Sequence, residues 1–85
     1  MQLTQVQDQA IQARMASIVG AETFDRLSAG IRFEELDGSL LYVHAKNEET
    51  AAEVEDNYSL HIAIVASKII GQEVEVVVVL PKVLQ

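Results

Sequence analysis

Apolar residues at helical spacing predict one long amphipathic helix in the second half of the chain, from about Glu48 to Ile70. Its apolar stripe comprises Ala51, Val54, Tyr58, Ile62, Val65 and Ile69. Residues three and four apart share one face of a helix, so this stripe would face the core. Asn47 is suited to cap the start of the helix, and Gly71 is suited to the left-handed position that follows many helix ends.

A different alternation predicts strands on both sides of this helix. Apolar and charged residues alternate after Ile31, which is typical of a half-buried strand, and a return strand reaches Ala45. Asp37-Gly38 is expected to form a type I′ hairpin turn, since such a turn needs positive φ at both central residues. The β-branched run from Val74 to Leu80 predicts a last strand that Pro81 ends.

Two helical segments are predicted before the hairpin. The first covers residues 3–19, with an apolar stripe of Leu3, Val6, Ala10, Ala13 and Ile18. The second runs from Ala21 to Leu27 and places Phe24 and Leu27 on one face, where both fill the core. The chain is therefore predicted to be an α+β domain of two layers in the order α-α-β-β-α-β. A three-stranded sheet packs on the helices, an outline similar to the KH fold.

Composition narrows the function classes. Eighty-five residues make one domain, and 49% apolar residues are enough for a folded core. The net charge of −7, with basic residues scattered singly, argues against direct binding of nucleic acid or an anionic membrane. The glycines also lack the Gly-X-X-Gly spacing with which KH modules clamp RNA. The absence of cysteine, of a signal-peptide pattern and of a long apolar run favours a cytoplasmic protein.

Candidate chemistry is sparse. His44 and His61 are the only imidazoles, and they do not have the close spacing of metal ligands. Glu55 and Asp56 could act as general acids, but no partner base stands out in the sequence. We therefore expect no catalytic residues, no metal and no cofactor. A small hydrolase or metal-dependent enzyme is the alternative, and it would need a pocket that holds His44 or His61 beside a carboxylate.

Two apolar patches exceed what one small core needs. Leu60 and Ile64 lie four apart and project away from the main stripe of the long helix, which suggests a docking or dimerisation surface. Alternatively, the first helix or a curving sheet covers them. The acidic start of the same helix, including Glu49 and Glu53, could attract a basic partner or could be a solvated face.

The second patch lies on the sheet. If one set of alternating residues faces the helices (Leu41, Val43, Val74, Val76 and Val78), the other set faces outward (Leu40, Tyr42, Val77 and Val79). Clustered apolar side chains on an open sheet face indicate a protein partner. Alternatively, helices cover both faces of the sheet, or scattered exposed valines carry no meaning.

The order of elements resembles the N-terminal domain (domain I) of DnaA, the bacterial chromosomal replication initiator. The resemblance runs from about Phe24 to Leu80 and is carried by Phe24, Leu40-Leu41-Tyr42-Val43, Ala45-Lys46-Asn47, Tyr58, Ile62, Gly71 and Val74 to Val79. The N-terminal region offers only aliphatic residues where some family members carry an aromatic residue linked to self-association, and the chain departs from the family at three further positions. Leu27 replaces a common Trp, Thr23 replaces an acidic residue linked to helicase contact, and Glu49 replaces an aromatic residue at a partner-contact position.

The resemblance implies a non-catalytic protein-interaction domain spanning residues 1–85. Such a domain forms a weak homodimer and docks replication partners, such as the replicative helicase or an initiation regulator. The expected contact residues are Leu60, Ile64, Leu40, Tyr42, Val77, Val79, Glu49 and Glu53. An alternative is a standalone small acidic regulator, encoded by a phage or plasmid, that mimics this domain.

Overall fold

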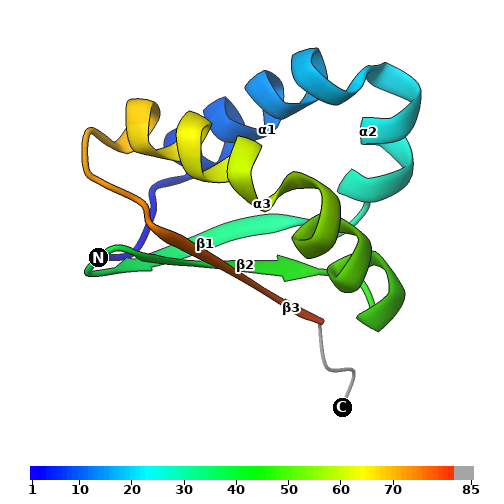
Figure 1. The fold of residues 1–85 in the computed structure, drawn as a ribbon. Coiled ribbons are helices and arrows are strands. Elements are labelled where there is room, and N and C mark those ends of the chain that lie inside the picture. The colour runs from blue at the N-terminus through cyan, green and yellow to red at the C-terminus, as the bar shows by residue number, and fades with distance from the viewer. Residues whose placement is uncertain (82–85) are drawn as a thin grey trace.

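The order of elements in the structure, a computed structural model that describes residues 1–81, is the predicted one. The helices are α1 (Gln5–Val19), α2 (Ala21–Ser28) and α3 (Glu48–Ile70), and the strands are β1 (Arg32–Asp37), β2 (Leu40–Ala45) and β3 (Val76–Pro81). The strands form one sheet in the order β1-β2-β3, in which β1 pairs antiparallel and β3 parallel with β2. The helices form a second layer on one face of this sheet (Figure 1), so the predicted two-layer α+β fold is confirmed.

The ends of α3 follow from local chemistry that the sequence predicted. The Asn47 side chain accepts a hydrogen bond from the backbone N–H of Thr50 at 2.8 Å, which satisfies one of the free donors at the helix start. Gly71 adopts φ 77° and ψ 23°, a left-handed conformation that costs glycine little, and its N–H donates to the carbonyl of Ser67. Both predicted boundaries of this helix are confirmed.

The hairpin is confirmed, but its turn lies one residue later than predicted. Asp37 still pairs with Leu40, so Gly38 and Ser39 form the loop. Gly38 has φ 63°, and within residues 1–81 positive φ occurs at glycines alone. A type II′ turn needs positive φ only at its first central residue, whereas the predicted type I′ turn needs it at both. The prediction of a type I′ turn at Asp37-Gly38 was therefore wrong.

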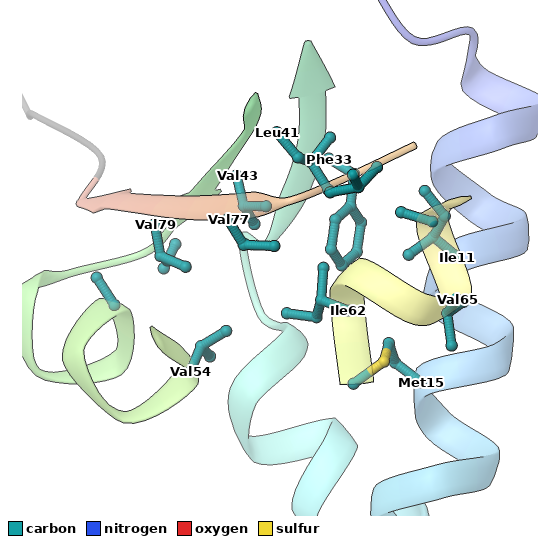
Figure 2. Packing of buried hydrophobic residues seen from close by; sticks show 14 of the residues in the cluster. Ile11, Met15, Phe33, Leu41, Val43, Val54, Ile62, Val65, Val77 and Val79 are labelled. Carbon is teal, nitrogen blue, oxygen red and sulfur yellow. The ribbon is translucent and has the colours of Figure 1, made fainter. Parts of the chain in front are cut away.

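The core lies between the sheet and α3 and extends to α1 (Figure 2). Its largest fully buried side chains are Phe33, Ile11, Leu36, Leu41, Ile62 and Val43. The predicted stripe of α3 supplies Ala51, Val54, Ile62 and Val65 to this core, with Tyr58 and Ile69 at its margin. On the sheet side of the core, strand β3 contributes Val77 and Val79.

The predicted stripe of α1 was wrong. Val6 is 75% exposed and Ile18 is 46% exposed, whereas Ile11 and Met15 are buried. Because apolar residues are spread around this helix, periodicity did not distinguish its inner face. The inner face is set by contacts with α3 and by a hydrogen bond from the backbone N–H of Phe33 to Asp8 at 2.8 Å.

The predicted inward and outward residues of β3 are also reversed. Val77 pairs with Leu41, and paired residues of adjacent strands share a face, so Val77 and Val79 point toward the helices. Val74 is buried as predicted, but regular strand begins only at Val76, and the alternation slips by one residue between the two. A slip of one residue moves every following side chain to the opposite face.

Candidate protein-binding surface

The face of the sheet that points away from the helices is largely apolar. We call it the outer sheet face, and its members on β2 and β3 are Leu40, Tyr42, His44, Val76, Val78 and Leu80. The register places Leu40 beside Val76 and Tyr42 beside Val78, so the apolar side chains are contiguous. Val76 is 51% exposed and Leu80 is 39% exposed. In Figure 1 the helices α1, α2 and α3 all lie on the other side of the sheet.

Leu40 and Tyr42 therefore lie where the alternation of β2 predicted them, but their neighbours differ from the prediction. Val77 and Val79, predicted to face outward, belong to the core, and the outward positions are taken by Val76 and Val78. Because nearly every residue of β3 is apolar, no signal within the strand indicates this register, which is set by contacts with the hairpin. Glu75 donates its backbone N–H to the carbonyl of Ser39 at 2.9 Å, which ties the strand to the hairpin turn.

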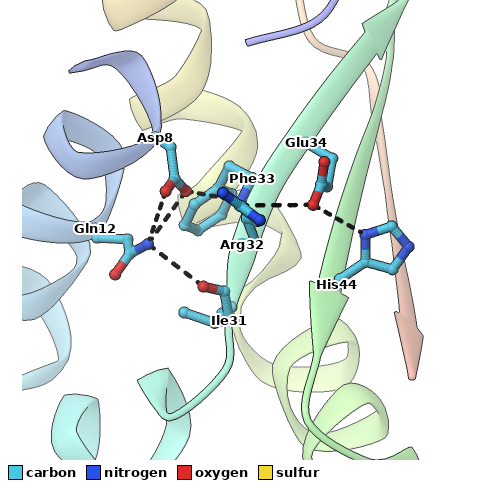
Figure 3. Close-up of polar contacts among 7 residues, drawn as sticks. All are labelled: Asp8, Gln12, Ile31, Arg32, Phe33, Glu34 and His44. Atoms are coloured by element: carbon cyan, nitrogen blue, oxygen red, sulfur yellow. Dashed lines mark hydrogen bonds and ion pairs between the residues drawn. The ribbon is translucent and has the colours of Figure 1, made fainter. Parts of the chain in front are cut away.

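Charged residues of β1 border the apolar part of this face. Glu34 lies between Arg32 and His44, with its Oε1 at 3.7 Å from Arg32 Nε and 3.6 Å from His44 Nδ1 (Figure 3). Glu35 and Asp37 follow along the strand and are both exposed. A β-bulge between Phe33 and Glu35 places both glutamates near one position of β2, which increases the density of negative charge.

The two ends of the outer sheet face differ in charge. At the hairpin end, Asp37 lies beside Leu40, and the Oε2 of Glu75 accepts a hydrogen bond from Ser39 Oγ at 3.1 Å. At the opposite end, Arg32 pairs with His44 across the strands. The face is therefore acidic at the hairpin end, whereas at the other end the charge of Arg32 is paired with Glu34.

Other parts of the chain bond to backbone groups along both edges of the sheet. On the β1 edge, Asp8 accepts from the N–H of Phe33, and the carbonyl of Glu34 accepts from the N–H of Leu3 at 2.9 Å. On the β3 edge, Glu55 accepts from the N–H of Val79 at 3.2 Å, so this predicted candidate acid has a structural partner. Strand edges with occupied donors are poor templates for a further strand.

A second exposed apolar surface lies on α3. Leu60 is 71% exposed and Ile64 is 50% exposed, and we call this pair the α3 patch. Both residues point away from the core stripe of the same helix, as predicted. Within residues 1–81, neither α1 nor the sheet covers these two side chains, so that alternative was wrong.

The predicted acidic contacts Glu49 and Glu53 have different environments. Glu49 is exposed in the first turn of α3. Glu53 forms a bidentate pair with Arg26 of α2, with both N···O distances at 2.8 Å. The hydrogen bonds and charge of Arg26 lower the pKa of Glu53, and those of Glu53 raise the pKa of Arg26. Glu53 therefore links α2 to α3 and is not free to attract a partner.

This ion pair predicts a pH dependence of stability. Because the pKa of Glu53 is lower in the folded chain than its ordinary value near 4.5, its contribution is complete above that value and is lost as pH falls through the lowered pKa. Glu53→Gln should therefore lower the melting temperature slightly at pH 7 and leave it nearly unchanged at pH 3. Thermal unfolding followed by circular dichroism checks this, with Asp56→Asn as the control on the same helix. An equal loss at both pH values would contradict it.

Two hollows in the described surface differ in their lining. An apolar crevice of about 20 Å³ lies between the helices and β1, and its lining includes Phe24 and Tyr58. A polar groove of about 310 Å³ at the start of α1 is lined by side chains that include Asp8 and Arg32. Neither His44 nor His61 lines either hollow. Among the described residues, no group of three metal-ligating side chains comes together.

No protein-family model and no curated protein matches this chain. In the part of the chain that the structure describes, none of the helices combines the length and the apolar content needed to cross a bilayer.

Proposed function

We propose that this chain is a non-catalytic protein-interaction domain resembling the N-terminal domain of DnaA, which self-associates and docks replication partners such as the replicative helicase or an initiation regulator. The observation that carries the proposal is the apolar outer sheet face, which lies opposite the helical layer (Figure 1). Sheets bury apolar faces against another layer, and contiguous exposed apolar patches mark interaction sites.

Residues that carry the resemblance occupy positions that support the proposal. Phe24 packs at the margin of the core, and Leu27, which replaces the family's common Trp, is buried at 5% exposure. Asn47 caps α3, and Tyr58 and Ile62 face the core one turn apart on that helix. These contacts support the resemblance, because Leu27 fills the core at the position where the family commonly has a Trp.

The two apolar surfaces suit different partners. We assign self-association to the α3 patch, in which Leu60 and Ile64 of one copy would contact those of a second copy. Full burial of such a side chain contributes about 1.5 to 3 kcal/mol, whereas association costs about 4 to 15 kcal/mol. A contact built on two such residues per copy therefore gives a weak homodimer, and the outer sheet face remains available for docking.

Leu60→Asp combined with Ile64→Asp is expected to abolish self-association and to leave the circular dichroism spectrum unchanged. The physical reason is that both side chains are exposed in the monomer, so new carboxylates meet water there but would repel each other in a dimer. Sedimentation equilibrium over a range of concentrations measures the effect. The control is Gln9→Asp with Ala13→Asp, which adds the same charge to exposed positions of α1. Unfolding of the double variant would show that the α3 patch belongs to the core.

The docking part of the proposal is tested with the purified replicative helicase from the same genome. Interferometry with the immobilised domain should detect binding that survives the α3 double variant, because the outer sheet face lies on another surface. Absence of both helicase binding and self-association in the wild-type chain would refute the proposed function.

A further inference from the structure

We propose that the outer sheet face binds a basic amphipathic α-helix of the partner protein, aligned with β2 and β3, with its basic side chains at the hairpin end. This inference rests on the proposed function and specifies the chemistry of the partner at that surface. It is carried by the size of the face, by the distribution of charge around it and by the state of the sheet edges.

The size of the face matches one helix. Strands of six residues extend about 20 Å, and three strands span about 14 Å across. A helix of about fourteen residues has the same length and is about 10 to 12 Å wide.

The charge around the face selects a basic partner. Glu35, Asp37 and Glu75 surround the hairpin end of the apolar strip, and each is exposed. A second copy of this chain would bring the same carboxylates and a net charge of −7 to the contact. Lys or Arg side chains beside an apolar stripe would instead pair with these carboxylates at the rim and raise the rate of encounter.

The state of the edges argues for a helix rather than an added strand. A peptide that extends the sheet needs free backbone donors and acceptors along an edge strand. Asp8 and Glu55 occupy the N–H groups of Phe33 and Val79 on the two edges, and Pro81 has no N–H to offer on β3. Each edge is therefore partly occupied, whereas the outer sheet face lies open on the side away from the helices (Figure 1).

A titration with designed peptides tests the inference. The probes are a helical peptide of about fourteen residues with a leucine stripe and lysines elsewhere, its counterpart with glutamates, and a scrambled lysine peptide without a stripe. The lysine probe should bind at least tenfold more tightly than the other two. In heteronuclear NMR spectra it should shift the amides of Leu40, Tyr42, Val76 and Val78. Its affinity should fall severalfold when salt is raised from 0.05 to 0.3 M, since the pairs at the rim are screened.

Matched variants separate the apolar and charge contributions. Tyr42→Ser with Val78→Ser should weaken the lysine probe at least tenfold, and Val76→Ser, at a half-exposed position, provides a milder variant if the first fails to fold. Asp37→Lys with Glu75→Lys should also weaken it about tenfold. The control is Glu49→Lys with Asp56→Lys on α3, which changes net charge equally and should alter affinity less than twofold.

Three outcomes would overturn the inference. The glutamate probe could bind as tightly as the lysine probe, or the shifted amides could lie on α3. Alternatively, the variants of the outer sheet face could abolish self-association and leave peptide binding unchanged, in which case a second copy occupies the face. The proposed function would survive each of these, because it fails only if the wild-type chain binds neither itself nor a replication partner.

Discussion

Val77→Asp is expected to unfold the domain, whereas Val76→Asp, one position earlier in the same strand, is expected to leave it folded. Val77 is 7% exposed and faces the helices beside Leu41, whereas Val76 is 51% exposed on the outer sheet face. An unpaired carboxylate in an apolar core costs several kcal/mol, and the lost burial of valine adds about 2 kcal/mol. Small domains have only about 5 to 15 kcal/mol of stability in total.

Thermal unfolding followed by circular dichroism distinguishes the two variants. Both place the same side chain in the same strand, so a difference between them reports only the face on which each residue lies. Val79→Asp and Val78→Asp form a second pair with the same expected contrast, since Val79 is buried and Val78 lies outward. If the outward members of both pairs unfolded and the inward members did not, the register of β3 would be wrong.

The second large effect concerns α1. Ile11→Ala is expected to reduce the free energy of unfolding by about 2 to 5 kcal/mol, because Ile11 is fully buried and alanine would leave a cavity. Val6→Ala is expected to change it by less than about 0.5 kcal/mol, because Val6 is 75% exposed and alanine favours a helix more than valine does. The two residues lie on the same helix, so the difference measures only its orientation.

Urea denaturation gives both free energies under one condition, provided that the dependence on urea concentration is the same for all three proteins. A loss for Val6→Ala as large as that for Ile11→Ala would contradict the orientation of α1. It would instead support the stripe that the apolar pattern alone suggested, in which Val6 faces the core.

The local sequence determines α3 more fully than α1. In α3, the stripe, the Asn47 cap and the Gly71 terminus all indicate the same helix, and the structure has the predicted boundaries. In α1, apolar residues occur all around the helix. The sequence of that segment therefore gives no physical reason to place Val6 rather than Ile11 in the core. Only the contacts with α3 and with Phe33 decide which side is buried.

One candidate surface was predictable from the sequence, and the other was predictable only in part. The exposure of Leu60 and Ile64 was predictable because both lie opposite a clear core stripe on one helix. The outer sheet face was predicted only for β2, where Leu40 and Tyr42 alternate with Leu41 and Val43. In β3 nearly every residue is apolar, so the pattern does not distinguish inward from outward positions, and Val77 and Val79 were assigned to the wrong face.

The sequence by itself determined the order of elements, the boundaries of α3, the existence of the hairpin and the acidic character of the chain, because each depends on neighbouring residues or on composition. The tertiary structure alone decided which side of α1 is buried, where β3 starts and therefore which valines form the outer sheet face. Those features depend on pairing between distant segments, such as Leu41 with Val77 and Ser39 with Glu75. A shift of one residue in such pairing reverses every side chain while leaving the local pattern unchanged.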